Sequence, residues 1–190
     1  MNEQLSELLH LLSIRRTVHD FAPGPLPPGL LERALHAAQW APCHRHTWPW
    51  RFTRVGPQAR ERLADLAVEL KQAELGATLG PEKAAAMRNA LLHPAELLHL
   101  GCVMDPKPEI DRENYAALAG AVLQMQLVIS HAGFGFKWST GKLAMHSQVR
   151  SILHVPDDVR SEGFLLMGVP ARVPTPPARP PLEQVYREVP

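Results

Sequence analysis

The chain is poor in the features that mark extracellular and nucleic-acid-binding proteins. It has only two cysteines, Cys43 and Cys102, in 190 residues, which is too few for a disulfide framework. Its formal net charge of +1 gives no attraction toward a polyanion such as nucleic acid. Its first residues include Glu3 and Glu7, where a secretory leader would have a basic region followed by an apolar one. These absences predict a reduced, cytoplasmic location and no nucleic-acid partner.

Charge is also absent from one long segment, residues 115–136, around which we expect the fold to be organised. Apolar residues recur in it at helical spacing on two faces, one formed by Leu118, Val122, Met125 and Ile129 and the other by Leu123 and Leu127. A membrane span is the alternative, but two glutamines, a serine and a histidine interrupt the run, and no second run exists. The pattern favours a helix buried in a core or subunit interface, and no membrane partner.

The distribution of proline divides the chain. Its 19 prolines cluster at residues 23–28 and 170–190, so they mark a connection and a tail and do not indicate disorder throughout. We therefore expect a single domain over residues 1–169. The proline-rich C-terminal extension, residues 170–190, is expected to pack on a partner subunit.

The remaining apolar residues alternate between the helical and the strand period. Helices are predicted over residues 3–13, where leucines form one face, between the prolines at 27 and 42, from Pro57, and between Pro81 and Pro94. Strands are predicted over residues 50–55, 97–104 and 163–169. We expect residues 105–114 to form a loop, residues 137–141 a polar turn, and Ser147 to cap a short helix.

Two arginines follow the first predicted helix. Arg15 and Arg16 precede Thr17, and His19 comes two residues later. Two guanidinium groups and a hydroxyl suit a phosphate, which accepts several hydrogen bonds at once. The alternative is a pair of solvated arginines with no ligand.

Two other segments have the residue types of a site. The irregular segment 42–49 is rich in histidine and tryptophan, and the predicted turn at 137–141 follows a buried helix, where backbone amides can meet a ligand. The ligand types of zinc occur at Cys43, His44, His46 and Cys102, but their spacing matches no familiar structural zinc motif. A metal site is thus an alternative, and we expect none.

Four motifs, taken in order, resemble those of the FMN-dependent nitroreductase family, in its short, minimal branch. They are Arg15-Arg16-Thr17, Ala41-Pro42 leading to Trp48-Pro49-Trp50-Arg51-Phe52, Gly133-Phe134-Gly135 with Trp138-Ser139-Thr140-Gly141, and Gly163-Phe164-Leu165 with Gly168-Val169-Pro170. Each motif alone is common. Their order and spacing together carry the resemblance, which covers the chain from about residue 8 to residue 186.

The resemblance implies an α+β fold, with a central mixed, mainly antiparallel sheet flanked by helices. It implies an intertwined homodimer with FMN at the interface, so that residues 1–169 form an FMN-binding domain and the segment 115–136 lies in the dimer core. NAD(P)H would be the electron donor, and a nitroaromatic, a quinone or a similar small molecule the acceptor.

The resemblance also assigns roles to individual residues. It places Arg15, Arg16 and Thr17 at the phosphate and ribityl end of FMN, and matches Arg179 to a basic residue used against the same phosphate. It places Trp138, Ser139, Thr140 and Gly141 along the flavin, where backbone donors can meet N5 and O4. His44 and His46 match positions from which the partner subunit reaches the cofactor.

The chain departs from the family pattern at His19, where a lysine or arginine usually faces flavin N1 and O2. Because reduced flavin carries negative charge at N1, and a histidine is a cation only when protonated, we expect a reduction potential that depends on pH in the histidine range. His46, Trp48 and Trp40 also replace usual family residues, and these changes affect the substrate pocket more than the cofactor.

The expected reaction is a ping-pong transfer of a hydride from NAD(P)H through flavin N5 to the acceptor. The cofactor provides the redox chemistry, so no side chain is assigned as a catalytic residue. Two alternatives remain open at this point: a flavin-binding protein without NAD(P)H oxidoreductase activity, and a different flavin-dependent reaction on the same scaffold.

Overall fold

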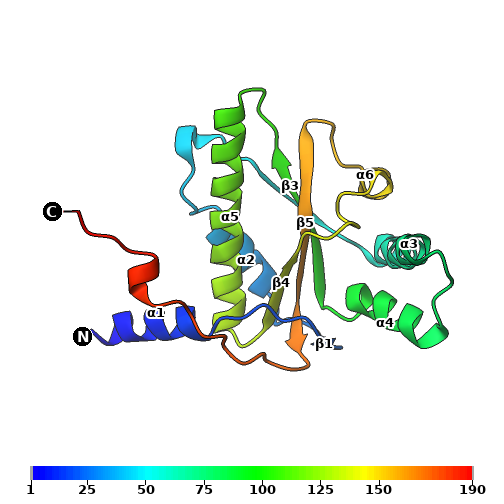
Figure 1. Cartoon of the computed structure of the whole chain (residues 1–190), viewed down its shortest axis with the longest axis horizontal. Coiled ribbons are helices and arrows are strands. Elements are labelled where there is room, and N and C mark those ends of the chain that lie inside the picture. Colours follow the sequence, from blue (N-terminus) through cyan, green and yellow to red (C-terminus); the bar gives the residue numbers. More distant parts are fainter. Residues whose placement is uncertain (1, 190) are drawn as a thin grey trace.

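The computed structural model describes residues 2–189 and is built on one five-stranded sheet (Figure 1). The strands are β1 (Phe21–Ala22), β2 (Trp50–Arg54), β3 (Glu96–Val103), β4 (Gly135–Ser139) and β5 (Val159–Pro170). Strand β3 lies between β2 and β5, while β4 and β1 both pair with β5. Every pairing between these strands is antiparallel, and an isolated bridge between Thr17 and Phe136 is parallel. The predicted α+β class with a mainly antiparallel sheet is confirmed.

Helices cover both faces of this sheet (Figure 1). One face packs against α2 (Leu30–Ala38) and α5 (Pro108–His131), and the other against α3 (Pro57–Leu75), α4 (Pro81–Leu92) and α6 (Ser147–Leu153). The strand period assigns the side chains to the two layers: in β3, Leu98 and Leu100 belong to the core beneath α5, and Leu97 belongs to the opposite core.

Helix α5 confirms the predicted organising helix but begins earlier than expected. Residues 105–114 were predicted to be a loop, and this prediction is wrong because the helix starts at Pro108. A proline is tolerated in the first helical turn, where its missing N–H costs nothing, and Glu109 and Asp111 stabilise the positive end of the helix dipole. The charges at 109–113 thus belong to the first turns of the helix, while Asp105 and Lys107 precede it.

The two predicted apolar faces of α5 differ in burial within one chain. Leu118, Met125 and Ile129 are fully buried against the sheet, but Leu123 is 45% exposed. The expectation that the helix is covered all round therefore does not hold for a single chain. Among residues 2–189, no helix is long and apolar enough to span a bilayer.

A strand replaces the turn that was predicted at residues 137–141. Gly133 has a φ of 83° and turns the chain out of α5, after which Gly135–Ser139 forms β4 along β5. The glycine at 135 is required by packing, because an added Cβ would lie 3.0 Å from the side chain of Val18. Polarity at Lys137 and Ser139 concealed the strand, since only one face of it meets the apolar core beneath α5.

The remaining predicted elements are close to those observed. Strands β2, β3 and β5 confirm the three predicted strands, and β1 was not predicted. The cap of α6 was assigned to the wrong residue: His146, whose Nδ1 accepts from the Gln148 amide at 3.4 Å, is the N-cap, and Ser147 is the first helical residue.

The first helix and the C-terminal segment extend from the same side of the molecule (Figure 1). Helix α1 (Glu3–Ile14) confirms the predicted leucine face, but Leu5, Leu8, Leu9 and Leu12 are all more than 40% exposed. The segment after β5 is extended except for the short 3-10 helix η2 (Leu182–Gln184), and its apolar side chains are also exposed. Both segments therefore present apolar surface that this chain does not cover.

Candidate functional site

Three arginines gather where α1 ends. Arg15 is the C-cap of the helix and Arg16 follows it, both half-buried, while Arg179 comes from the C-terminal segment. Burial lowers the pKa of the Arg15 guanidinium, and the charges of Arg16 and Arg179 lower it further. Within residues 2–189, no carboxylate lies within 4.0 Å of any of the three. Positive charge is thus concentrated here without a partner.

Arg16 has hydrogen-bonding capacity that the described chain does not use. Its Nη1 donates to the carbonyl oxygen of Arg15, but its Nε is buried and has no partner within residues 2–189. A buried N–H without an acceptor costs about 1–3 kcal/mol, so such groups are usually paired with protein, water or a bound ion. An anion with several acceptor oxygens satisfies both the unpaired Nε and the excess of charge.

Strand β4 lies directly beside this cluster. The Val18 amide donates to the Phe136 carbonyl at 3.0 Å, next to the bridge between Thr17 and Phe136. From there β4 leads to a cavity of about 200 Å³, whose lining includes Lys137, Ser139 and Gly141. The structure therefore brings the arginine segment and the predicted segment 138–141 together.

The opposite wall of this cavity comes from α4 and β5. Met87, Ala90 and Leu91 line it from α4, and Phe164 and Leu166 from β5. The sequence analysis assigned no role to α4, because a helix of alanines and charged residues gives no motif. The lining is mostly apolar, as is typical of sites for flat organic ligands.

Trp138 does not line this cavity. Alternation along β4 turns it to the other face of the sheet, where its ring lies 6.3 Å from that of Tyr115 and packs against the core beneath α5. Its indole N–H donates to the Glu162 carbonyl at 2.8 Å. Residues 138 and 139 thus belong to a strand and not to the predicted turn: Ser139 and Gly141 line the cavity, and Trp138 lies on the other face of the sheet.

His19 lines a neighbouring cavity of about 180 Å³. Asp20, Asn89 and His93 also line it, and Ala90 of α4 belongs to both cavities. The His19 side chain is exposed. It therefore lies near the cavity of β4, separated from it by one small residue.

His44 and His46 lie at the other end of α5. They belong to the 3-10 helix η1 (His44–His46), where His44 Nε2 is 4.0 Å from the Glu113 carboxylate. The arginine segment instead contacts α5 through Gln126, whose side-chain amide donates to the Arg16 carbonyl at 3.5 Å. Thirteen helical residues separate the two contacts, so the two groups are about 20 Å apart within one chain. A single chain does not bring them together.

The loop around η1 holds strained backbone. Arg45, His46 and Trp48 have φ values of 60°, 52° and 45°, in the left-handed region that residues with a Cβ rarely adopt. The rings of His46 and Trp48 are stacked, with centroids 5.3 Å apart and planes 5° apart. The Trp48 amide donates to Cys43 Sγ at 3.3 Å, and the Thr47 hydroxyl donates to buried Asn114 at 2.6 Å. These contacts fix a half-exposed indole on the surface.

No group of three or more possible metal ligands occurs in the part of the chain that the structure describes. Cys43 instead bonds within its own loop, and Cys102 is buried in the sheet. Burial raises the pKa of the Cys102 thiol to about 11, which disfavours the thiolate that a metal requires.

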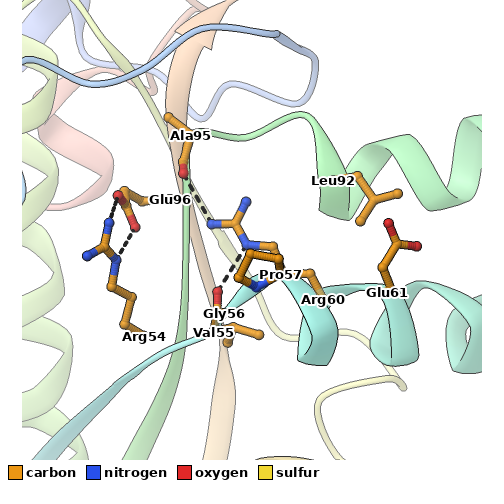
Figure 2. A pocket seen from close by; sticks show the side chains of 9 residues that line it. All are labelled: Arg54, Val55, Gly56, Pro57, Arg60, Glu61, Leu92, Ala95 and Glu96. Atoms are coloured by element: carbon orange, nitrogen blue, oxygen red, sulfur yellow. Dashed lines mark hydrogen bonds and ion pairs between the residues drawn. The ribbon is translucent and has the colours of Figure 1, made fainter.

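Another cavity, of about 560 Å³, lies away from these residues, between α3 and the edge of the sheet (Figure 2). The two arginines that line it already have partners within the chain. Arg60 donates to the carbonyls of Val55 and Ala95, and Arg54 pairs with Glu96 (Figure 2). Arg60 also donates to the Pro94 carbonyl. These contacts hold α3 against the ends of β2 and β3, and Glu96 neutralises Arg54.

Comparison with known proteins shows the same fold along nearly the whole chain. YfhC of Bacillus subtilis, an NAD(P)H nitroreductase by name, is 25% identical, and the match covers 98% of this chain and 96% of YfhC. YdjA of Escherichia coli K12, named in the same way, is 28% identical over 86% of this chain and 88% of its own.

Solved structures agree with the observed architecture. A nitroreductase-like family protein from Bacillus cereus superposes with a TM-score of 0.82 at 22% identity, covering 96% of this chain and 95% of its own. The NADPH:FMN oxidoreductase of Vibrio harveyi, solved with NAD+, gives 0.76 at 16% identity, covering 95% and 76%. The model of the Nitroreductase family matches residues 12–169, and the chain therefore belongs to that family.

Proposed function

We propose that this protein is an FMN-dependent oxidoreductase that transfers a hydride from NAD(P)H to a small acceptor by a ping-pong mechanism. The observation that carries the proposal is the unpaired arginine cluster, with its unsatisfied Arg16 Nε, beside the cavity of β4. Membership of the Nitroreductase family and the names of YfhC and YdjA support the same reading.

Arg15, Arg16 and Arg179 would hold the phosphate of FMN. The phosphate dianion offers acceptors to the guanidinium N–H groups, including the buried Nε, and each charge-assisted bond is about twice as strong as a neutral one. Thr17 is exposed and lies between the arginines and β4, so its hydroxyl would meet the ribityl end.

The flat ring system would then extend along β4. Ser139 and Gly141 line the cavity, and Thr140 lies between them just beyond the end of the strand, where backbone amides are free of the sheet ladder. Met87 and Ala90 of α4 would cover one face of the ring and exclude water. His19, in the neighbouring cavity, would face the ring edge from the side.

A second subunit would complete the site as a homodimer. His44 and His46 contact α5 about 20 Å along the helix from the contact of the arginine segment, so in the dimer they would reach the flavin bound to the partner. The C-terminal extension, residues 170–190, and the leucine face of α1 would pack on that partner, which removes their exposed apolar surface from water.

Bound FMN would supply the redox chemistry, the transfer of two electrons from NAD(P)H to the acceptor. With a quinone, NAD(P)H and one proton give NAD(P)+ and the hydroquinone. Nitroaromatics accept two electrons and two protons in the same way, with loss of water. The residues of the chain bind, orient and shield the cofactor, and none acts as a nucleophile.

The test separates binding from turnover. Wild-type protein should bind FMN more tightly than riboflavin, because only FMN has a phosphate. Arg16→Gln should weaken FMN binding at least tenfold and leave riboflavin unchanged, while Arg172→Gln, an exposed arginine of the C-terminal segment, should change neither. Equal affinities of wild-type protein for FMN and riboflavin would refute the phosphate site.

Turnover is tested by adding NADH and then NADPH to the FMN complex without oxygen and following the visible absorption band. Bleaching by either coenzyme, and recovery on adding a quinone, are the expected results. Bound flavin that neither coenzyme reduces would instead indicate a binding protein or another electron donor.

A further inference from the structure

Lys137 contributes a positively charged side chain to the lining of the cavity of β4. Its neighbours Phe136 and Trp138 belong to the core beneath α5, so alternation along the strand turns Lys137 to the α4 side, with Ser139. There it is half-buried and faces Ala90 and Met87 across the cavity. The sequence analysis mentioned Lys137 only as the start of a turn, because the strand period was not recognised.

The lysine has no countercharge in the part of the chain that the structure describes. No carboxylate lies within 4.0 Å of its ammonium group, and Asp and Glu are missing from the lining of the cavity. The nearby Lys142 differs, because it pairs with Glu74 at 3.1 Å. A half-buried cation in a mostly apolar lining is unfavourable unless an anion completes it.

The cation is also close to the arginine segment. Phe136, the residue before Lys137, accepts the Val18 amide and bridges to Thr17. A ligand whose phosphate meets Arg15 and Arg16 can therefore reach Lys137 by following β4. On the far side of Ala90 lies His19, whose cavity also contains Asp20 and His93.

We propose that Lys137 contacts the flavin ring and supplies a permanent positive charge that stabilises its reduced, anionic form. This inference rests on the proposed function, since it requires FMN to be bound at the arginine cluster. Hydride transfer adds two electrons and one proton to neutral flavin, so the product carries one more negative charge than the reactant. A fixed cation beside the ring would therefore bind that product more tightly than the oxidised form.

The test is the reduction potential of bound FMN in Lys137→Met, which keeps the length of the side chain and removes its charge. We expect the ratio of affinities for reduced and oxidised FMN to fall at least tenfold, which lowers the potential by about 30 mV for a two-electron couple. Lys137→Arg should restore the wild-type value. Lys142→Met, which removes an exposed and paired lysine, is the matched control and should leave the potential unchanged.

The possible outcomes separate the two proposals. If wild-type protein binds no FMN, the proposed function fails and this inference with it. If wild-type and Lys137→Met bind FMN with the same potential, only the role of Lys137 is overturned. A higher KM for NADPH but not for NADH, at an unchanged potential, would assign the lysine to the coenzyme phosphate and also overturn it. Should the Met variant fail to fold, Lys137→Gln gives the same comparison.

Discussion

A buried histidine should make the stability of the fold depend on pH. His99 lies in the middle of β3, is 1% exposed, and its Nε2 is hydrogen-bonded to the Ser161 hydroxyl at 2.9 Å. Its ring also meets that of Phe164 edge-on. Burial, with a smaller effect from the charge of Arg150, lowers the pKa of His99 from 6.5 to about 4. The folded protein therefore holds this imidazole neutral in mildly acidic solution.

The size of the effect follows from that difference in pKa. Between pH 6.5 and pH 4 the unfolded chain binds a proton at His99 that the folded chain does not, so the free energy of unfolding falls as the pH falls. One pKa unit corresponds to about 1.4 kcal/mol. Lowering the pH from 7 to 5 should therefore remove about 2 kcal/mol, and the full loss, reached below pH 4, is about 3 kcal/mol.

Urea unfolding at pH 7 and pH 5, at one protein concentration, measures this loss in wild-type protein and in His99→Gln. The variant should lose about 2 kcal/mol less between the two pH values, because glutamine does not titrate. His10→Gln, which removes an exposed histidine of α1, should keep the wild-type difference. If His99→Gln shows the same pH difference as wild type, or if His99 titrates near pH 6.5 by NMR in the folded protein, the reasoning is wrong.

Three further predictions concern the cysteines, a glycine and His19. A thiol reagent should label one cysteine of the folded protein, the partly exposed Cys43, and both only after unfolding, because Cys102 is fully buried. Gly163→Ala should destabilise the protein by more than 1 kcal/mol, measured by urea unfolding, because φ is 135° and the added Cβ would lie 2.5 Å from the Ser139 carbonyl oxygen. The reduction potential of bound FMN should vary less steeply with pH in His19→Lys than in wild type, and matching slopes would contradict a role for His19.

Local patterns predicted the elements whose apolar residues form a clear pattern in the sequence. Helix α1 was predicted from the spacing of its leucines, β2 from its alternation and β5 from its apolar run. Such patterns are visible in the sequence without knowledge of tertiary contacts. The two main errors share one cause. Polar residues at 105–114 and 137–141 indicated irregular structure. The charges at 109–113, however, lie in the first turns of α5, and Lys137 belongs to a strand and lines a cavity.

The candidate site was predictable only in part for a related reason. The arginine pair could be recognised because two guanidinium groups beside a hydroxyl suggest a phosphate wherever they occur. The contribution of Met87 and Ala90 could not, because it depends on α4 packing against α3 and lying across from β4, a contact between distant parts of the chain. The face of the sheet on which Trp138 lies could be predicted only once β4 was recognised as a strand.

The length of α5 relates the two halves of the site to the exposed apolar surface. One end of the helix contacts the arginine cluster through Gln126, and the other contacts the strained loop of His44 through Glu113, about 20 Å away. In the proposed homodimer, a second chain would place its own loop beside the first chain's cluster, so that the two groups could share a ligand. That arrangement requires the partner to pack along α5, where Leu123 is exposed, and near the leucine face of α1. The surface that one chain leaves uncovered is thus the surface that a shared site would need.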